Sequence, residues 1–174
     1  MVAYAAGAIL APVMTRYVDK ARLLMILMAI VAVLSLLFFF VPKDMLWAIF
    51  ALNILISLAL GPKSPLTWSM YADTADYNEW KTGRRATAMT FSAATFAQKI
   101  GGSLGSAGML WVLAAIGYAA NQAQSGASET GIALLQTAIP GCFAVLAVFV
   151  VRYYRLTGPQ LKSIQEVLDR DNAA

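Results

Sequence analysis

The chain has 174 residues, of which 60% are hydrophobic and 13% are charged, with a formal net charge of +4 and a mean hydropathy of +0.67. Soluble domains are about 45–50% apolar and about 25% charged, so this composition excludes an ordinary soluble domain. The absence of histidine and the single cysteine, Cys142, exclude a His/Cys metal site and an internal disulfide. The cations lie in alternate connections and not on one soluble face, so no nucleic-acid partner is expected.

Five apolar segments follow one another along the chain, at residues 1–14, 23–41, 45–70, 87–118 and 131–151. The second carries no charge, and at about 1.5 Å per residue it just crosses a bilayer core of roughly 30 Å. The first is too short to span comfortably and contains Pro12. Because these segments are too long for barrel strands, and only helices then satisfy their backbone groups in lipid, we expect an all-α integral membrane protein. It should have four full transmembrane helices and a truncated first one, in a bundle over residues 1–152.

The loop cations predict the orientation of this bundle. They fall after the first, third and fifth segments, whereas Lys43 stands alone between the second and third and residues 119–130 carry none. Cations mark the cytoplasmic side of a membrane protein, so we expect a cytoplasmic C-terminus. Five crossings would then place the N-terminus outside.

Residues 153–174 are expected to form a cytoplasmic tail. Within it, residues 156–171 predict a short amphipathic helix whose apolar stripe consists of Leu161, Ile164 and Leu168. This pattern favours a tail that lies along the membrane or the bundle, and a partner-binding role is the alternative.

Lys99 is the foremost candidate for a functional residue. It lies deep in the fourth apolar segment, where a lysine costs several kcal/mol unless it faces a polar cavity or a carboxylate. Thr95 is four residues earlier and so on the same helical face, and Gln98 is adjacent. Together they offer ammonium, hydroxyl and amide groups that can bind sugar hydroxyls. The alternative is that Lys99 extends to the cytoplasmic interface.

A second candidate set lies in the sequence GPKSPLTW, residues 61–68. Its glycine and prolines weaken the helix, and freed backbone groups in a membrane are tolerated beside a cavity or a protein partner. Lys63 and Ser64 are therefore expected to line a cavity, and Trp68 could stack on the apolar face of a sugar. The alternative for Trp68 is a place in the interfacial aromatic belt.

The connector at residues 72–85, ADTADYNEWKTGRR, carries both charge signs. Asp73, Asp76 and Glu79 stand three residues apart, so a helical continuation would place them on one face. The residues alone favour a solvated loop that follows the positive-inside rule. The alternative is a set of ion pairs that hold one side of a carrier closed. The gating set is Asp73, Asp76, Glu79, Lys81, Arg84 and Arg85.

Two further patterns bear on function. Gly101 and Gly105 form a G-x-x-x-G step, which favours close packing of two helices. No phosphate-binding glycine loop and no carboxylate pair inside a pocket is evident, and no cofactor is indicated. We therefore expect no catalytic residues and no enzyme.

Residues 72–85 and the sequence FSAATFAQKIGG, residues 91–102, resemble the glycoside–pentoside–hexuronide:cation symporters, the melibiose-carrier-like branch of the major facilitator superfamily. In that family, residues matching Lys99 and Thr95 lie at the sugar pocket. The resemblance also makes gating the favoured interpretation of the charges in residues 72–85. The resemblance implies that the chain corresponds to the last four and a half helices of the C-terminal six-helix half. The acids that bind the coupling cation, Na⁺, Li⁺ or H⁺, would lie in the other half.

The resemblance thus implies a C-terminal fragment of a sugar symporter of the bacterial inner membrane. Its partners would be the lipid bilayer, a sugar or glycoside and the N-terminal half of the carrier, and the fragment alone should not catalyse coupled symport. The alternative is a small membrane interaction protein built on a transporter-derived bundle.

Overall fold

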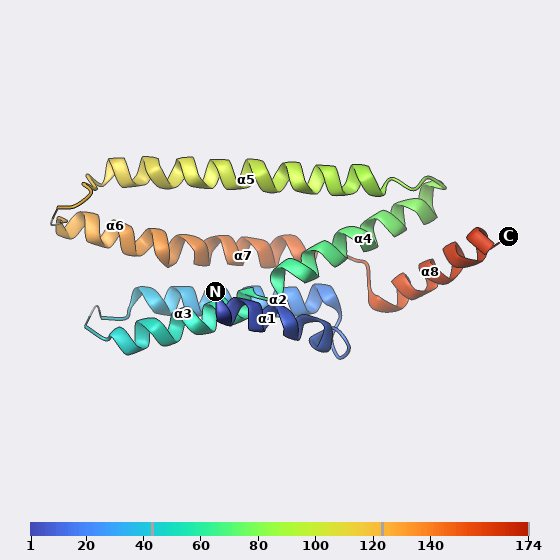
Figure 1. Cartoon of the computed structure of the whole chain (residues 1–174), viewed down its shortest axis with the longest axis horizontal. Coiled ribbons are helices and arrows are strands. Elements are labelled where there is room, and N and C mark those ends of the chain that lie inside the picture. The colour runs from blue at the N-terminus through green and yellow to red at the C-terminus, as the bar shows by residue number, and fades with distance from the viewer. Residues whose placement is uncertain (43, 123, 174) are drawn as a thin grey trace.

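The computed structural model describes residues 1–42, 44–122 and 124–173, and within these ranges the chain is helical with no strand (Figure 1). This confirms the all-α expectation. Lys43, on which part of the orientation argument depends, lies outside the described residues. The helices are α1 (Val2–Met14), α2 (Lys20–Phe39), α3 (Leu46–Leu60), α4 (Lys63–Thr82), α5 (Thr87–Ala115), α6 (Gly126–Gln136), α7 (Ala138–Arg152) and α8 (Gly158–Ala173).

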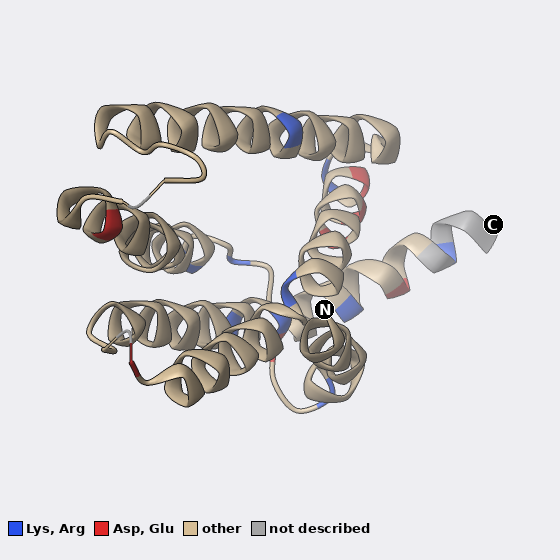
Figure 2. Cartoon of the chain, turned by 60° about the vertical axis from the view of Figure 1, so that its left-hand side comes forward, with Lys and Arg blue, Asp and Glu red and all other residues tan. Residues whose placement is uncertain are grey.

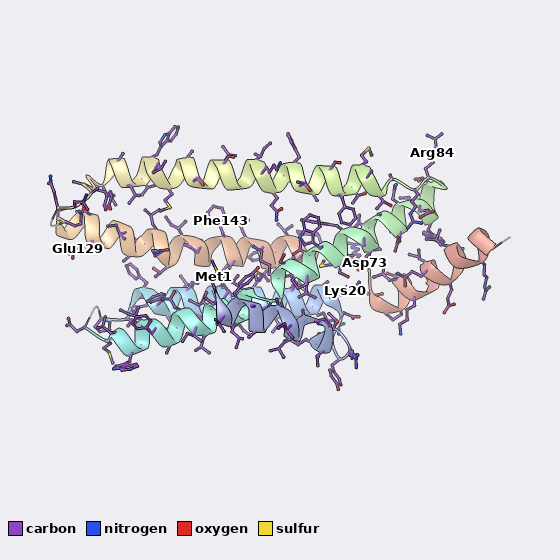
Figure 3. All side chains as sticks on the ribbon, viewed as in Figure 1. Met1, Lys20, Asp73, Arg84, Glu129 and Phe143 are labelled. Carbon is purple, nitrogen blue, oxygen red and sulfur yellow. The ribbon has the colours of Figure 1, made fainter. Side chains whose placement is uncertain are left out.

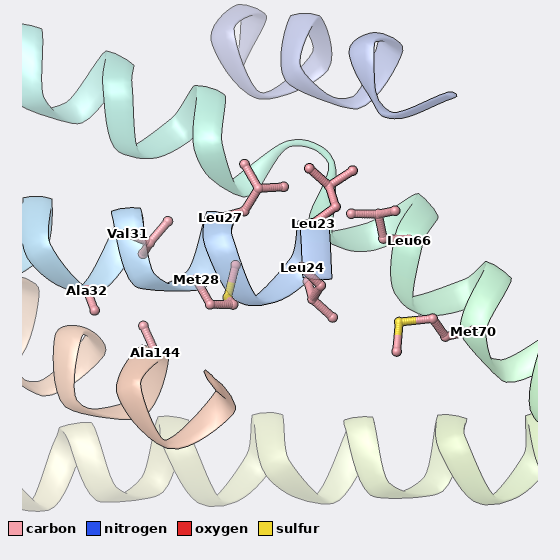
Figure 4. Close-up of a cluster of buried hydrophobic side chains, with 9 residues drawn as sticks. All are labelled: Leu23, Leu24, Leu27, Met28, Val31, Ala32, Leu66, Met70 and Ala144. Atoms are coloured by element: carbon pink, nitrogen blue, oxygen red, sulfur yellow. The ribbon is translucent and has the colours of Figure 1, made fainter. Parts of the chain in front are cut away.

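The core is built around α2, which packs against α7, α3 and α4. A helix that is apolar on all sides, as α2 is, has to be covered by other helices or by lipid. On its covered sides, α2 contributes most of the buried cluster shown in Figure 4, and α4 and α7 supply the remainder. The members of the cluster are Leu23, Leu24, Leu27, Met28, Val31, Ala32, Leu66, Met70 and Ala144.

The third apolar segment is two helices, α3 and α4, and they meet at Gly61 and Pro62. Proline lacks the N–H that would continue the ladder of α3, but it is well suited to the start of a helix. A Cβ on Gly61 would collide with the backbone of α1, including the nitrogen of Ala8 at 2.7 Å. The break in the segment therefore also lets α1 cross in close contact.

The hydrophilic connector at residues 72–85 is helical as far as Thr82, which corrects the expectation of a loop. Charged residues do not end a helix, because lysine and glutamate are good helix formers. The end comes at Gly83, which adopts a left-handed conformation with φ of 66° and donates its N–H to the carbonyl of Glu79 at 2.8 Å. Most of the gating set therefore projects from a rigid element.

The fifth apolar segment is also divided, into α6 and α7, and it begins earlier than residue 131. Ser125 precedes α6 and its hydroxyl accepts a hydrogen bond from the N–H of Ser128 at 3.2 Å, which is a typical helix start. The break falls at Thr137, ahead of Pro140, whose ring is compatible with the first turn of a new helix.

Three stretches of the described chain are long and apolar enough to cross a membrane: Lys20–Phe39, Leu46–Thr82 and Gly126–Arg152. The helix α5, expected as a further span, does not meet this criterion despite its 29 residues. Its central sequence QKIGGSLGS is rich in small and polar residues, which lowers its hydropathy. The number of four full spans therefore stays a prediction.

The connections lie at two opposite ends of the bundle. The α2–α3 and α5–α6 connections lie at the left of Figure 1, and the α1–α2, α4–α5 and α7–α8 connections lie toward the right. Figure 2 shows basic residues gathered toward α4 and α8, away from the left-hand connections. Among the described residues, Asp44 and Glu129 lie in or beside the left-hand connections, which carry no described cation. The cations of the connections thus lie at one end of the fold, together with most of the described acids.

Candidate functional site

Lys99 and Thr95 lie on the same face of α5, as their spacing predicted. They line an open pocket of about 420 Å³ together with Phe91, Ser92 and Phe96. The hydroxyl of Thr95 donates to the carbonyl of Phe91 at 2.8 Å, and its oxygen keeps lone pairs that can accept further hydrogen bonds. The pocket therefore combines an ammonium group, two hydroxyls and two aromatic rings. All of its lining residues come from α5, so its opposite side is open.

Aromatic rings from α4 continue this surface. Trp68 stacks on Phe91 with ring centroids 5.7 Å apart and an interplanar angle of 15°, and Tyr71 meets both rings edge-on. The indole predicted for sugar stacking is thus joined to the Lys99 pocket through Phe91. Sequence reasoning missed Phe91, although its position four residues before Thr95 places it on the same helical face.

Lys63 lies in a different pocket. It lines a space of about 380 Å³ between α2, α3 and α7, where Asn53 and Gln136 are further polar groups. The residues lining these two pockets do not include Ser64 or Gln98. The structure therefore brings Lys99, Thr95 and Trp68 into one region and places Lys63 in another.

Asp73, the first acid of the gating set, is buried and paired. Its two carboxylate oxygens accept hydrogen bonds from the ammonium group of Lys20 at 2.8 and 2.7 Å (Figure 3). Lys20 is the first residue of α2, so the pair fixes the start of α2 to the middle of α4. Sequence reasoning missed Lys20 as the partner, because its only signal was its place among the basic residues of the α1–α2 connection.

The other gating residues turn to different partners. Asp76 accepts a hydrogen bond from the side-chain amide of Gln165 in α8 at 3.5 Å. Glu79 lies 3.6 Å from the guanidinium of Arg85, which is the pair nearest to the expected acid–base arrangement. Lys81 and Arg84 are exposed, and Arg84 points away from α4 in Figure 3. The acids of α4 thus connect it to three other parts of the chain.

The tail helix α8 packs onto this end of the bundle. Leu161 and Ile164 are buried, and the N–H of Gly158 donates to the carboxylate of Asp19 at 3.3 Å. Asp19 directly precedes α2, yet its side chain makes no capping bond to that helix. The tail therefore lies along the bundle, held at its first residue by the α1–α2 connection.

Tyr154, outside the apolar helices, sits beneath this tail. Its hydroxyl is buried and makes no hydrogen bond of good geometry within the described residues. The nearby hydroxyl of Thr74 donates instead to the carbonyl of Met70. Burial, with the negative charge of Asp73 nearby, raises the pKa of Tyr154 to about 12, and the hydroxyl of Thr74 opposes the rise. Both main effects disfavour the phenolate. A small pocket of about 240 Å³ adjoins Tyr154, Asp73 and Lys20.

No group of three or more His, Cys, Asp or Glu side chains that could hold a metal ion occurs within the described residues. The acids of α4 point to separate partners, which is an arrangement for holding helices together.

Comparisons with known proteins add to this geometry. The family model described as MFS/sugar transport protein matches residues 1–158. The chain is 36% identical over 164 residues to the inner membrane symporter YicJ of Escherichia coli, covering 93% of this chain and 36% of that protein. It is 32% identical over 137 residues to the glucuronide carrier protein homolog of Escherichia coli, covering 79% and 30% of the two chains. It is 31% identical over 166 residues to the uncharacterized symporter YjmB of Bacillus subtilis, covering 93% of this chain and 35% of that protein.

The chain thus spans about a third of the length of these curated relatives. The resemblance to the melibiose-carrier-like symporters is confirmed, and the family is one of transport proteins rather than enzymes. The chain belongs to the MFS/sugar transport protein family.

Proposed function

We propose that this chain forms part of a sugar:cation symporter of a bacterial inner membrane, and that it works by alternating access together with helices beyond those of this sequence. The observation that carries the proposal is the pocket of Lys99 and Thr95, which adjoins the stacked rings of Trp68 and Phe91. Sugars present hydroxyls at their edges and an apolar C–H face, so hydrogen-bonding groups beside an aromatic platform suit them. The substrate would be a glycoside, a pentoside or a hexuronide.

The open side of the pocket supports the need for a second set of helices. None of the residues of α5 is buried, and major facilitators bind substrate between two six-helix halves. A pocket with one wall cannot exclude water from a sugar. We infer that the opposing half supplies the second wall and the site for Na⁺, Li⁺ or H⁺, and that this chain alone does not perform coupled transport.

The charged end of the bundle would be the cytoplasmic side, with the C-terminus inside. Cations gather at that end in the connections and in α8, as the positive-inside rule requires. Within this arrangement the pairs Lys20–Asp73 and Glu79–Arg85 would help to keep that side closed, and they would change partners as the carrier opens.

Calorimetric titration with a glucuronide and with a neutral glycoside tests the proposal, on the detergent-purified chain with and without the co-expressed first half. We expect saturable binding of a sugar that requires both halves and is lost in Lys99→Ala. Lys63→Ala is the matched control, because it removes the same charge from the other pocket.

Loss of binding in Lys63→Ala alone would move the site to the pocket between α2, α3 and α7. No binding in either preparation, with the protein folded and monodisperse, would overturn the symporter proposal. That result would favour the second candidate, an interaction protein that uses the uncovered α5 to bind another membrane protein.

A further inference from the structure

We propose that a further pocket, between the α1–α2 connection and the start of α8, binds the phosphate group of an anionic ligand, with an anionic lipid headgroup as the favoured source. The pocket measures about 590 Å³, and its lining includes three cations, Arg16, Arg22 and Lys162. Guanidinium and ammonium groups are the side chains that bind phosphate oxygens most strongly. This proposal does not depend on the sugar-binding function, because the two pockets share no lining residue.

The pocket has an unbalanced positive charge. The acid in its lining, Asp19, already accepts the N–H of Gly158. Lys20, directly beside it in sequence, is bound to Asp73. The ion pairs of the described residues include none of the three lining cations. The lining therefore carries three cations against the single carboxylate of Asp19, and an anion entering the pocket would meet cations that take part in no ion pair within the described residues.

The fold brings these cations together from distant parts of the sequence. Arg16 lies in the α1–α2 connection and Arg22 in the first turn of α2, whereas Lys162 is more than a hundred residues later, in the second turn of α8. Lys162 reaches the pocket because Leu161 and Ile164 are buried against the bundle and Gly158 is held by Asp19. The positive-inside rule requires cations near the ends of spans, but it does not require them to converge on one pocket.

The position along the chain places the pocket at headgroup level. Arg22 comes directly before the buried residues Leu23 and Leu24 of α2, the most apolar candidate span. Tyr17 in the same lining is 85% exposed, and exposed tyrosines are enriched at the membrane–water interface. The first residues of α8, Gly158 and Pro159, complete the lining, and a helix start favours a nearby anion. Basic pockets between helices on this side of a membrane suit phosphate-bearing lipids.

The test is a binding titration of the full chain in a neutral detergent. The probes are short-chain phosphatidylglycerol, phosphatidylcholine with the same acyl chains, and inorganic phosphate, each followed by the shift in thermal unfolding and by native mass spectrometry. We expect phosphatidylglycerol to bind at least tenfold more tightly than phosphatidylcholine. We further expect Arg22→Gln and Lys162→Gln each to weaken this binding roughly tenfold, about the loss of one charge-assisted hydrogen bond.

Arg152→Gln is the matched control, because it removes one cation from the same end of the bundle but not from the pocket lining. We expect it to bind phosphatidylglycerol like the unaltered chain. Arg16 is exposed and lies just after α1. Arg16→Gln replaces Arg22→Gln or Lys162→Gln as the test variant if either of them fails to fold.

The titration with inorganic phosphate shows whether the pocket binds free phosphate or only the phosphate of a lipid headgroup. If it shifts unfolding and displaces the lipid, the pocket accepts free phosphate as well as a headgroup; if only the lipid binds, the headgroup is the ligand. Equal affinity for phosphatidylglycerol and phosphatidylcholine would overturn the proposal. An equal loss in Arg152→Gln and Arg22→Gln would also overturn it, because the effect would then be that of net charge.

Discussion

The carboxylate of Asp73 has only 6% of its side chain exposed, so it needs the charge of Lys20 close by. Breaking a buried ion pair from one side leaves the other charge without compensation, which costs about 3–5 kcal/mol when both partners are buried. Because a third of Lys20 is exposed, we expect Lys20→Met to lower the free energy of unfolding by about 1–3 kcal/mol. A double-mutant cycle with Asp73→Asn, followed by thermal or detergent-induced unfolding, measures the coupling between the two.

The pair Glu79–Arg85 provides the control. It is longer, at 3.6 Å, and the Arg85 side chain is 65% exposed, so the same cycle with Glu79→Gln and Arg85→Gln should give less than about 1 kcal/mol. Coupling energies of equal size in the two cycles would contradict the distinction between a structural pair and a loosely held surface pair.

Tyr154 allows a prediction about pH. With an ordinary pKa of 10.0 when unfolded and about 12 when folded, it favours the folded state below pH 10, and this contribution is lost as the pH rises toward 12. Tyr154→Phe removes a buried hydroxyl that has no described partner. We expect this variant to gain about 1 kcal/mol in stability and to lose less stability than the unaltered chain between pH 10 and 12, as measured by thermal unfolding across that range.

The neighbouring Tyr153→Phe is the matched control, because Tyr153 is 80% exposed. It should change neither the stability at neutral pH nor the alkaline slope. A loss of stability in Tyr154→Phe would mean that the hydroxyl contributes a favourable contact.

At the scale of elements, the glycines divide into two kinds. A Cβ on Gly7 would collide with the backbone of Leu58, and one on Gly61 with the backbone of α1, whereas Gly101 and Gly105 have no atom within 4 Å of an added Cβ. Backbone cannot move aside as a flexible side chain can. We therefore expect Gly7→Ala and Gly61→Ala to destabilise the bundle by several kcal/mol, measured as the midpoint of detergent-induced unfolding.

On α5 a glycine-to-alanine substitution should stabilise the chain and not destabilise it. Gly105→Ala replaces a residue of poor helix propensity where nothing obstructs the new methyl group, so the chain alone should gain about 0.5–1 kcal/mol. If Gly61→Ala were as well tolerated as Gly105→Ala, the close crossing of α1 over the α3–α4 junction would be wrong.

Element boundaries show what the sequence could predict. The apolar run of α2 and the weak point at Gly61 and Pro62 are local patterns, and both appear in the structure near their predicted places. The charged composition of residues 72–85 predicts a loop, but good helix formers continue α4 as far as Thr82, and the left-handed backbone of Gly83 ends the helix. The break at Thr137 depends on how α6 and α7 pack, and the local sequence does not predict this packing.

The candidate site also has a part that the sequence predicts and a part that it does not. Thr95 and Lys99 share a face because they are four residues apart on one helix, and this geometry can be read from the sequence. The stacking of Trp68 on Phe91 requires α4 and α5 to meet, and the Lys20–Asp73 pair joins residues 53 positions apart. Contacts of this kind depend on tertiary packing, so a single sequence could not reveal them.

At the scale of the whole molecule, α5 is the helix that the chain leaves uncovered. It contacts α4 and α6 near its ends, and none of its residues is buried. Its step of small residues, Gly101 and Gly105, predicts close packing with another helix, and in the described chain no atom beyond the neighbouring backbone of α5 lies within 4 Å of a Cβ added at either glycine. Gly101 is two residues from Lys99, so this face lies on the opposite side of α5 from the Lys99 pocket. If the proposed second half also covers this face, small residues there serve close approach to that half.

This leads to a prediction about assembly. Gly105→Leu should leave folding of the isolated chain intact, because the space beside it is open, and should reduce co-purification with the co-expressed first half severalfold. Ala107→Leu is the matched control, since it lies two residues along and so on the opposite side of α5. The measurement is the ratio of the two halves after affinity purification through a tag on one of them. If both variants assemble like the unaltered chain, the Gly105 face of α5 meets lipid in the carrier.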